Sequence, residues 1–277
     1  MKKMFNGLYF KHQKDDRSVS FIAGSSDDHA FIQVITNDGS HYIRYPLSAH
    51  VHTQTVAVGD SVFSRRGVNI RIDEPDLSIN GEIKYSGLTP LRYDIMGPFR
   101  YLPMQCSHRI ISLHHKLEGS VTIDGETIDF IGGAGYVEGD KGASFPKNYM
   151  WVQCNDFAQK ACVTLSVADV PFAGLCFRGC VGVVYFGDTE YRFATYLGAK
   201  IVCCNENLII IKQGKLLLEI EIDAGTGHGL LAPDNGEMTR HIRERIACGA
   251  KFRLTRGSET LFEKRSQNAS FERVTEQ

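Results

Sequence analysis

The chain of 277 residues is long enough for one large β domain or two smaller units, and its 43% hydrophobic and 23% charged residues are those of an ordinary globular protein. The formal net charge of −1 gives no excess of positive charge to bind a phosphate backbone, so no nucleic acid is expected among the partners. The first residues lack the apolar core of a signal peptide, and no run of 18 apolar residues predicts an integral membrane segment, so we expect a soluble cytoplasmic protein.

Apolar and polar residues alternate with a period of two along most of the chain, which predicts β-strands rather than helices. In chain order, the strand-like runs are 18–24, 30–36, 41–47, 61–72, 77–87, 109–119, 120–132, 151–157, 161–169, 181–196, 200–223 and 251–265. Asp124-Gly125 separates two alternating stretches and is therefore a hairpin signature.

This number of runs predicts an all-β fold with little helix. It exceeds the about eight to ten strands of a single barrel, so we expect two antiparallel β-barrel or sandwich halves. Glycines at positions 132, 133 and 135 give the chain conformational freedom between the two halves. We therefore predict an N-terminal β domain over residues 1–134 and a C-terminal β domain over residues 135–277.

Eight cysteines lie at positions 106, 154, 162, 176, 180, 203, 204 and 248. No Cys-x-x-Cys motif occurs and the spacing matches no zinc site, so the favoured interpretation is reduced, small core residues. Two alternatives stay open. Cys176 and Cys180 would form a redox pair, and Cys106 with His108 would belong to a metal site.

Histidines mark the strand-like stretch 104–119. His108, Ser112 and His114 are predicted to share one strand face, since alternate residues point the same way. If that face lines a pocket, the histidines supply bases or hydrogen bonds to a hydroxyl-bearing ligand. In the alternative interpretation they face water.

Residues 135–155, GYVEGDKGASFPKNYMWVQCN, combine acids with aromatic rings. Tyr136, Glu138 and Asp140 are expected on one strand face. Two carboxyl groups so close cannot both ionise cheaply, so in a partly dry pocket one would have a raised pKa and act as a general acid. The alternative is a solvent-exposed turn with surface ion pairs to Lys147.

The second part of this stretch follows a turn at Phe145-Pro146. Trp151, Gln153 and Asn155 then share a face, and side-by-side strands would place them with the acid pair. Aromatic faces stabilise a developing cation. Acid and aromatic groups together suit protonation of an alkene and capture of the carbocation.

Residues 228–246 form a charged stretch. Met238, Ile242 and Ile246 are spaced by four, which favours a short helix over 238–246. The charged residues of this stretch are interpreted as a solvated face: Arg240, Arg243, Glu244 and Arg245. The chain contains no phosphate-binding glycine loop, no Gly-x-Ser-x-Gly and no Gly-x-Gly-x-x-Gly, which argues against an NTPase, a standard α/β-hydrolase and a Rossmann dehydrogenase.

The residues quoted above, together with 30–47, 95–119 and 228–246, resemble the tocopherol cyclase-like family in order along nearly the whole chain. The pattern Glu-x-x-x-Gly-x-x-Phe-Pro-Lys followed by Trp-x-Gln-Cys-Asn carries the resemblance. It implies a lipocalin-like, calycin-type architecture in two halves, similar in outline to carotenoid hydratase-type proteins. The implied reaction is the redox-neutral, acid-catalysed cyclisation of a prenylated phenol or quinol, or a related isoprenoid, which needs no cofactor.

Several positions depart from the plant members of that family. Leu8 and Lys141 stand where those proteins carry tryptophan, and Tyr149-Met150 replaces Trp-Phe. The compact chain looks like a bacterial member. Fewer aromatic residues in the predicted pocket put a long prenyl substrate in question, while the fold is less affected.

The leading hypothesis is therefore a cyclase whose proton donor is Glu138 or Asp140, with the other as its charge partner. The predicted catalytic residues are Glu138, Asp140, His108 and His114, the histidines orienting or deprotonating the attacking hydroxyl. The predicted substrate-binding residues are Tyr136, Trp151, Gln153, Asn155, Phe145 and Lys147.

Two other functions stay open at this point. One is a non-catalytic lipocalin-like binder of a hydrophobic small molecule, and the other is hydration of an isoprenoid double bond. All three hypotheses have a hydrophobic small molecule as partner, and none calls for a metal ion or cofactor. Contact with a membrane would be transient, and the sequence does not determine the oligomeric state.

Overall fold

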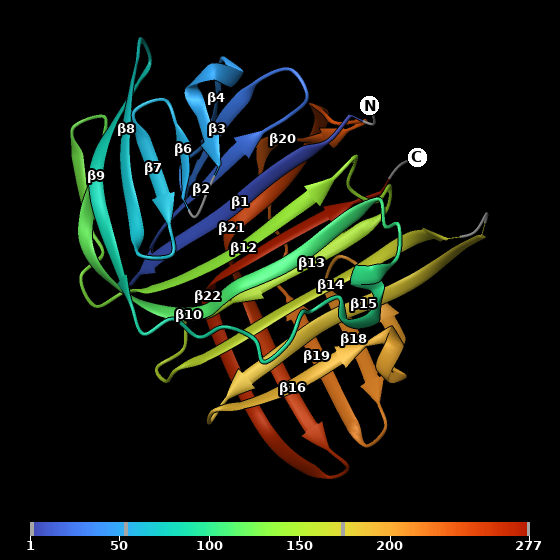
Figure 1. Cartoon of the computed structure of the whole chain (residues 1–277). Helices are drawn as coiled ribbons and strands as arrows, with labels where there is room; N and C mark the ends of the chain where they lie inside the picture. Colours follow the sequence, from blue (N-terminus) through green and yellow to red (C-terminus); the bar gives the residue numbers. More distant parts are fainter. Residues whose placement is uncertain (1–2, 53–54, 173–174, 276–277) are drawn as a thin grey trace.

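The computed structural model describes residues 3–52, 55–172 and 175–275, and nearly all of its regular structure is β-strand (Figure 1). The strands of the first sheet are β1 (Phe5–Lys14), β2 (Arg17–Ser25), β3 (Ala30–Thr36), β4 (Ser40–Tyr45), β5 (His50–His52), β6 (Val56–Val58), β7 (Ser61–Ser64), β8 (Gly67–Glu74), β9 (Leu77–Ser86), β10 (Cys106–Ile123), β11 (Glu126–Asp129) and β12 (Ala134–Gly142).

The strands of the second sheet are β13 (Tyr149–Cys154), β14 (Ala161–Phe172), β15 (Leu175–Phe186), β16 (Thr189–Ala194), β17 (Lys200–Cys204), β18 (Leu208–Gln213), β19 (Leu216–Ile222), β20 (His228–Asp234), β21 (Glu237–Arg256) and β22 (Glu259–Val274). Short 3₁₀ helices lie at η1 (Leu47–Ala49), η2 (Gly97–Tyr101) and η3 (Thr195–Leu197).

Each sheet is antiparallel throughout. The first has the order β4-β3-β2-β1-β12-β10-β9-β8-β7-β6-β5 with β11 beside β10, and the second has the order β16-β15-β14-β13-β22-β21-β19-β18-β17 with β20 beside β21. In the described residues the two end strands of neither order pair with each other, so both sheets are open and curved (Figure 1). The predicted all-β class with two barrel- or sandwich-like halves is confirmed.

The predicted hairpin at Asp124-Gly125 is confirmed. Ile123 of β10 pairs with Glu126 of β11 around it. Asp124 and Gly125 have φ of 48° and 87°, the positive values that a two-residue type I′ turn requires.

The stretch that carries the acids and the tryptophan connects the two sheets. β12 pairs with β1 and β10 in the first sheet, whereas β13 pairs with β14 and β22 in the second. The two strands therefore do not lie side by side. The predicted domain boundary between residues 134 and 135 falls at the start of β12, before the chain changes sheet, and the division into two domains stays a prediction.

The helix predicted over residues 238–246 is wrong, because these residues belong to the long strand β21. Met238, Ile242 and Ile246 are buried. A spacing of four is also twice the strand period, so it places all three on one strand face. The polar residues between them interrupt the apolar pattern, so the strand period of two was not recognised in the sequence.

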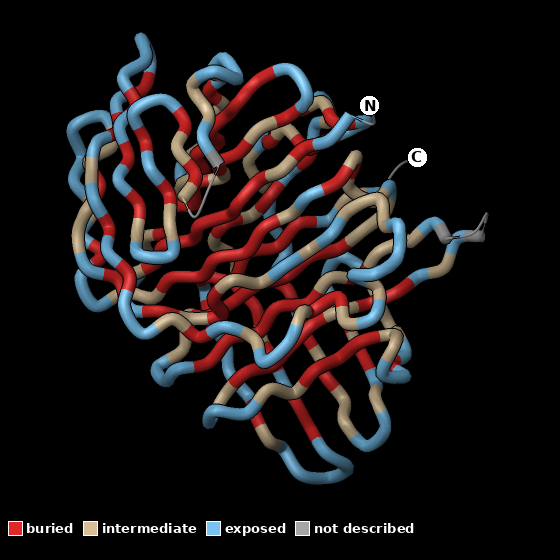
Figure 2. Tube along the Cα trace, in the orientation of Figure 1, coloured by how far each residue is buried: buried red, intermediate tan, exposed pale blue. Residues whose placement is uncertain are grey.

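Buried residues run through both sheets and form three apolar clusters (Figure 2). One cluster lies within each half, and the third joins the halves because it takes Tyr9 and Leu113 from the first sheet and Val183 and Leu230 from the second. Asn155 Nδ2 donates a hydrogen bond to the Gly135 carbonyl across the sheets over 2.8 Å. The two sheets thus pack face to face.

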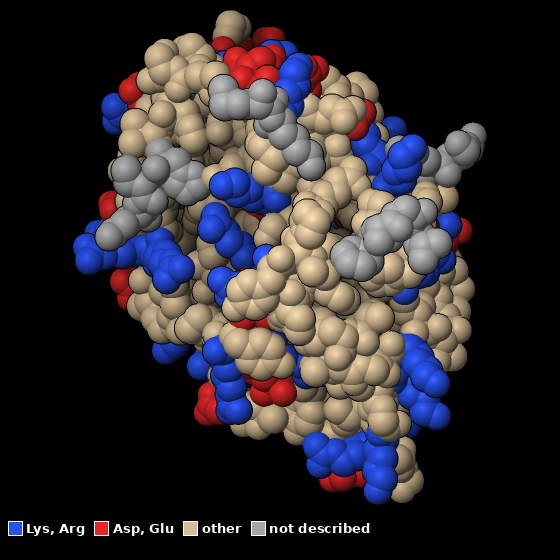
Figure 3. Space-filling model, turned by 45° about the vertical axis from the view of Figure 1, so that its right-hand side comes forward, with Lys and Arg blue, Asp and Glu red and all other residues tan. Residues whose placement is uncertain are grey.

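Charged side chains of both signs are scattered over the face drawn in Figure 3, among large areas of other residues. None of the helices in the described ranges has the length and apolar character needed to cross a membrane.

All eight cysteines are free thiols. Cys154, Cys162 and Cys180 are buried as predicted, whereas Cys176 is exposed. The proposed redox pair does not fit, since Cys176 and Cys180 lie four residues apart on the extended strand β15, which places them about 13 Å apart. A disulfide needs Cα atoms within about 7 Å.

Candidate active site

A cavity of about 200 Å³ lies between the two sheets, and most of the side chains around it are apolar. Apolar pockets with a few converging polar groups are the usual form of small-molecule sites. The titratable residues that line it are Tyr9, Cys106, His108, Glu138, Asp140, Tyr149, Cys180, Glu244 and Glu272.

The first sheet supplies His108, Glu138 and Asp140 from neighbouring strands. His108 of β10 is the cross-strand partner of Asp140 of β12, and Glu138 is the partner of Tyr9 on β1. Alternation along β12 turns both carboxyl groups to the cavity side, as predicted from the sequence. Glu138 is only 5% exposed, which rules out the alternative of a solvent-exposed turn for this residue.

Hydrogen bonds and one ion-pair contact join these groups. Nδ1 of His108 lies 3.0 Å from Oδ1 of Asp140, and its Nε2 lies 3.6 Å from Oε2 of Glu138. The Tyr136 hydroxyl donates to the same Glu138 oxygen over 2.5 Å. The imidazole therefore bridges the two carboxyl groups, and a phenol holds Glu138 from the other side.

Burial and charge set the protonation of this group. Burial raises the pKa of Glu138 to about 7, although the nearby His108 opposes the rise. Burial also lowers the pKa of His108, but the charges of Asp140 and Glu138 outweigh it and raise that pKa to about 9. At neutral pH the site therefore holds an imidazolium beside a carboxyl group that is partly protonated.

The second sheet contributes two more buried acids, Glu244 and Glu272, which sequence reasoning missed. Tyr9 donates to Glu244 over 2.7 Å across the cavity, and Tyr149 donates to Glu272. Burial raises the pKa of Glu244 to about 7 and that of Glu272 to about 8. Three glutamates of the cavity wall thus accept a hydrogen bond from a buried or partly buried tyrosine, the third pair being Glu138 with Tyr136, which lies behind the wall.

The prediction of a charged solvated face over 240–245 is wrong at Glu244, which is 2% exposed. A local signal was present. Glu244 lies two positions after Ile242 and two positions before Ile246. On a strand this spacing puts a residue on the same face as its apolar neighbours.

Aromatic rings surround the acids. Trp151 and Tyr9 meet edge to face with ring centroids 5.5 Å apart, and Phe145 contacts Phe5 at 5.4 Å and Tyr149 at 5.8 Å. All five residues line the cavity. Two of the predicted binding residues, Trp151 and Phe145, are therefore at the site.

The alternation predicted for His108, Ser112 and His114 is interrupted by a β-bulge. The register between β10 and β12 shifts between Ile110 and Ser112. His114 consequently does not line the cavity, and burial lowers its pKa to about 4. Ser112 donates to the His114 carbonyl over 3.0 Å. Of the three residues, His108 alone reaches the cavity.

The remaining predicted binding residues do not line the cavity: Tyr136, Gln153, Asn155 and Lys147. Gln153 and Asn155 are buried between the sheets, where the Gln153 amide donates to the Asn155 oxygen over 3.0 Å. The Gln153 oxygen also faces the buried Lys11 ammonium at 3.4 Å. Lys147 is exposed, and its carbonyl accepts a hydrogen bond from Arg240. These residues support the packing of the two sheets around the cavity.

Donor atoms of His108, Glu138 and Asp140 lie within 4.8 Å of one another, a spacing that is compatible with a divalent cation. Cys106, the alternative metal ligand considered with His108, donates instead from its thiol to Asp140 over 3.6 Å. Burial raises the pKa of this thiol, so it stays protonated.

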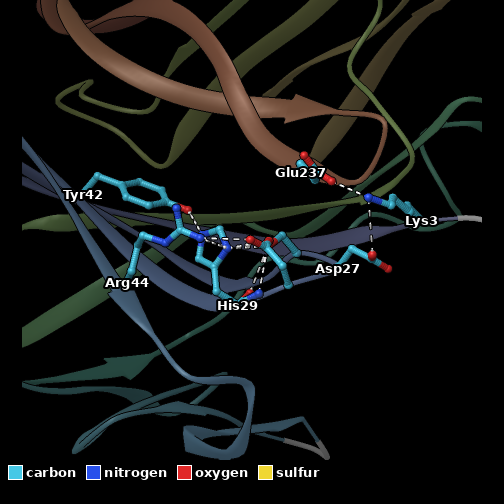
Figure 4. A network of polar contacts seen from close by, with 8 residues as sticks. Lys3, Asp27, His29, Tyr42, Arg44 and Glu237 are labelled. Atoms are coloured by element: carbon cyan, nitrogen blue, oxygen red, sulfur yellow. Dashed lines mark hydrogen bonds and ion pairs between the residues drawn. The ribbon is translucent and has the colours of Figure 1, made fainter.

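A separate polar cluster connects residues next to β1 and β2 of the first sheet with the hairpin between β20 and β21 (Figure 4). Lys3 forms ion pairs with Glu237 and, at 3.9 Å, with Asp27. The Asp27 amide also donates to the Gly236 carbonyl over 3.0 Å. These contacts hold the hairpin that carries Met238, one of the residues that line the cavity.

In the same cluster, His29 lies between Asp28 and Tyr42, with Nδ1 2.6 Å from the carboxylate and Nε2 2.5 Å from the hydroxyl (Figure 4). The Tyr42 ring stacks on Phe31 at 5.6 Å, and Phe31 lines the cavity. His29 and Tyr42 themselves do not line the cavity, so the cluster supports its wall from behind.

A family model described as tocopherol cyclase-like matches residues 79–194. The match confirms the predicted resemblance over less than half of the chain, and it spans His108, Glu138, Asp140 and Trp151. Glu244 and Glu272 lie outside it. No match was found among curated proteins.

Two solved structures share the fold. A protein assigned as AttH from Nitrosomonas europaea has a TM-score of 0.56 and 9% identity, covering 98% of this chain and 91% of that one. Kievitone hydratase from Nectria haematococca has a TM-score of 0.56 and 12% identity, covering 99% of this chain and 89% of that one. At such identities the likeness concerns the fold alone.

Proposed function

We propose that this protein is a tocopherol cyclase-like enzyme, which protonates a side-chain double bond of a prenylated phenol or quinol and closes a ring through the phenol oxygen. The observation that carries the proposal is the buried carboxyl group of Glu138, held by Tyr136 beside His108 in the wall of an apolar cavity. A carboxyl group with a pKa of about 7 is partly protonated at neutral pH and is suited to general acid catalysis.

In the first step Glu138 gives its proton to one alkene carbon. The π electron pair forms the new C–H bond, and the other carbon becomes a cation. The remaining Glu138 carboxylate faces the His108 imidazolium at 3.6 Å and still accepts the Tyr136 hydrogen bond. Both contacts stabilise the new negative charge, and they do so more strongly in a dry cavity than in water.

The cation is then captured by oxygen. The rings of Trp151 and Tyr9 line the cavity and offer aromatic faces that favour a positive charge. The phenol oxygen forms the C–O bond and loses its proton, so the product is an isomer of the substrate. The balance requires no oxidant, reductant or cofactor, and His114 receives no role because it lies off the cavity wall.

Hydration is the second candidate, and the fold shared with kievitone hydratase favours it. Protonation would be the same, but water instead of the phenol would supply the oxygen. A non-catalytic carrier would use the same apolar cavity without any proton transfer.

Isotope labelling separates these outcomes. With a hydroquinone that carries one five-carbon prenyl group, incubated in heavy water, we expect a ring-closed isomer with one carbon-bound deuterium by mass spectrometry. In water labelled with a heavy oxygen isotope, the cyclised product takes up no label, whereas a hydrated product takes up one oxygen.

Unchanged probe after prolonged incubation would contradict both enzymatic candidates and leave the carrier. Turnover that stops on addition of a chelator and returns with a divalent cation would contradict the cofactor-free proton transfer described above.

A further inference from the structure

The acids of the second sheet form a row opposite Glu138. Glu244 on β21 is the cross-strand partner of Glu272 on β22, and Glu272 is the partner of Trp151 on β13. Directly paired residues have side chains on the same face of a sheet. All three line the cavity. The row therefore forms a continuous polar strip in an otherwise apolar wall.

Glu244 and Glu272 are expected to share one proton. They are 2% and 8% exposed, and each accepts a hydrogen bond from a tyrosine. Two neighbouring carboxyl groups in a dry site cannot both ionise cheaply, so one stays neutral while the other carries the charge. Such a pair can accept or release one proton while no other group changes its charge.

Trp151 has a side-chain donor to which no described residue offers an acceptor. Its residue is 7% exposed, and within the described part of the chain its Nε1 makes no hydrogen bond. A buried donor without an acceptor costs free energy. Trp151 lines the cavity and is the cross-strand partner of Glu272, so a ligand oxygen bound there would lie near both an N–H donor and a carboxyl group.

Glu138 of the first sheet and the polar strip of the second sheet lie close enough to contact one substrate. Tyr9 is the cross-strand partner of Glu138 in the first sheet, and its hydroxyl reaches Glu244 in the second over 2.7 Å. Glu138 on one wall and Glu272 on the other both line the cavity, so one ligand can contact both.

We propose that Trp151 and Glu272 bind the attacking hydroxyl group and that the Glu272–Glu244 pair, which carries one negative charge, removes its proton. The inference rests on the proposed function above. As the hydroxyl oxygen forms its C–O bond with the cation, its O–H bond breaks and the proton passes to the carboxylate of the pair. Glu138 has lost one proton and the pair has gained one, so proton exchange with solvent or between the two walls restores the resting enzyme.

The first test compares pH–rate profiles of wild type, E272Q and E263Q with the single-prenyl hydroquinone. We expect wild-type turnover to fall on the acid side as the Glu272–Glu244 pair is neutralised. E272Q should lose this acid limb and about 100-fold in turnover. E263Q changes an exposed glutamate on the same strand and should behave like wild type. An unchanged acid limb in E272Q would overturn the inference.

The second test needs no turnover. Calorimetry compares the binding of 2-isopentylhydroquinone and of 3-isopentylphenol, which lacks the hydroxyl next to the side chain. Wild type and E263Q should prefer the hydroquinone by about tenfold, as one hydrogen bond provides, and W151F should lose that preference. Equal preference in wild type and W151F would overturn the inference.

The two tests also separate this inference from the proposed function. Wild-type turnover that survives in E138Q would overturn the role of Glu138, while the Glu272 and Trp151 results would still be interpretable. A binding preference that depends on Trp151, without any turnover by wild type, would support the hydroxyl site and contradict the enzymatic proposal.

Discussion

E138Q is expected to lower turnover of a prenylated hydroquinone by between about 10²- and 10⁴-fold, the usual contribution of a general acid. Glutamine has nearly the same shape and can still accept the Tyr136 hydrogen bond that Glu138 receives over 2.5 Å. It has no acidic proton to give to an alkene carbon. The loss should therefore appear in turnover, while the dissociation constant of 2-isopentylhydroquinone should change little.

The same experiment distinguishes the two acids that the sequence left equivalent. D140N removes the negative charge 3.0 Å from His108 but leaves the Glu138 proton in place. We expect D140N to keep measurable turnover where E138Q has almost none. The reverse order would assign the proton donor to Asp140 and would contradict the mechanism, and a folded circular dichroism spectrum for both variants is the necessary control.

E272Q is expected to be more stable than wild type at pH 9 and equally stable at pH 5. The folded protein raises the pKa of Glu272 to about 8 from 4.5, mainly through burial. A raised pKa means that the folded state binds more protons than the unfolded state between the two pKa values, so this contribution to stability is present below pH 4.5 and is lost progressively as pH rises to about 8. The difference should reach on the order of 3 kcal/mol.

Urea unfolding at pH 5, 7 and 9 measures this difference, because the free energy of unfolding is read for both proteins under identical conditions. Subtracting the free energy of unfolding of wild type from that of E272Q cancels the pH dependence contributed by other groups. These include the buried His12 and His115, whose pKa values are lowered to about 3. E263Q serves as the control, since the pKa of Glu263 is lowered and its titration lies below the tested range. A pH-independent difference for E272Q would show that Glu272 is not a buried acid.

The local pattern of the sequence determined the elements of this protein. Alternation predicted an all-β chain, Asp124-Gly125 predicted its hairpin, and the spacing of Glu138 and Asp140 predicted that both carboxyl groups share one face. These predictions succeed because a strand repeats every two residues, so neighbours in the sequence decide which way a side chain points. The resemblance to a family added a candidate reaction, and the family model matches the region of this acid pair, residues 79–194.

Only the tertiary structure decided which residues share the cavity. Glu244 and Glu272 come from strands more than 100 residues after Glu138 and face it because the two sheets pack against each other. His114 leaves the site because a bulge in β10, invisible in the pattern of residue types, turns the strand. A period of two sets the side of a strand on which a residue lies, but the packing of distant faces and the breaks in register depend on contacts between segments that are remote in the sequence.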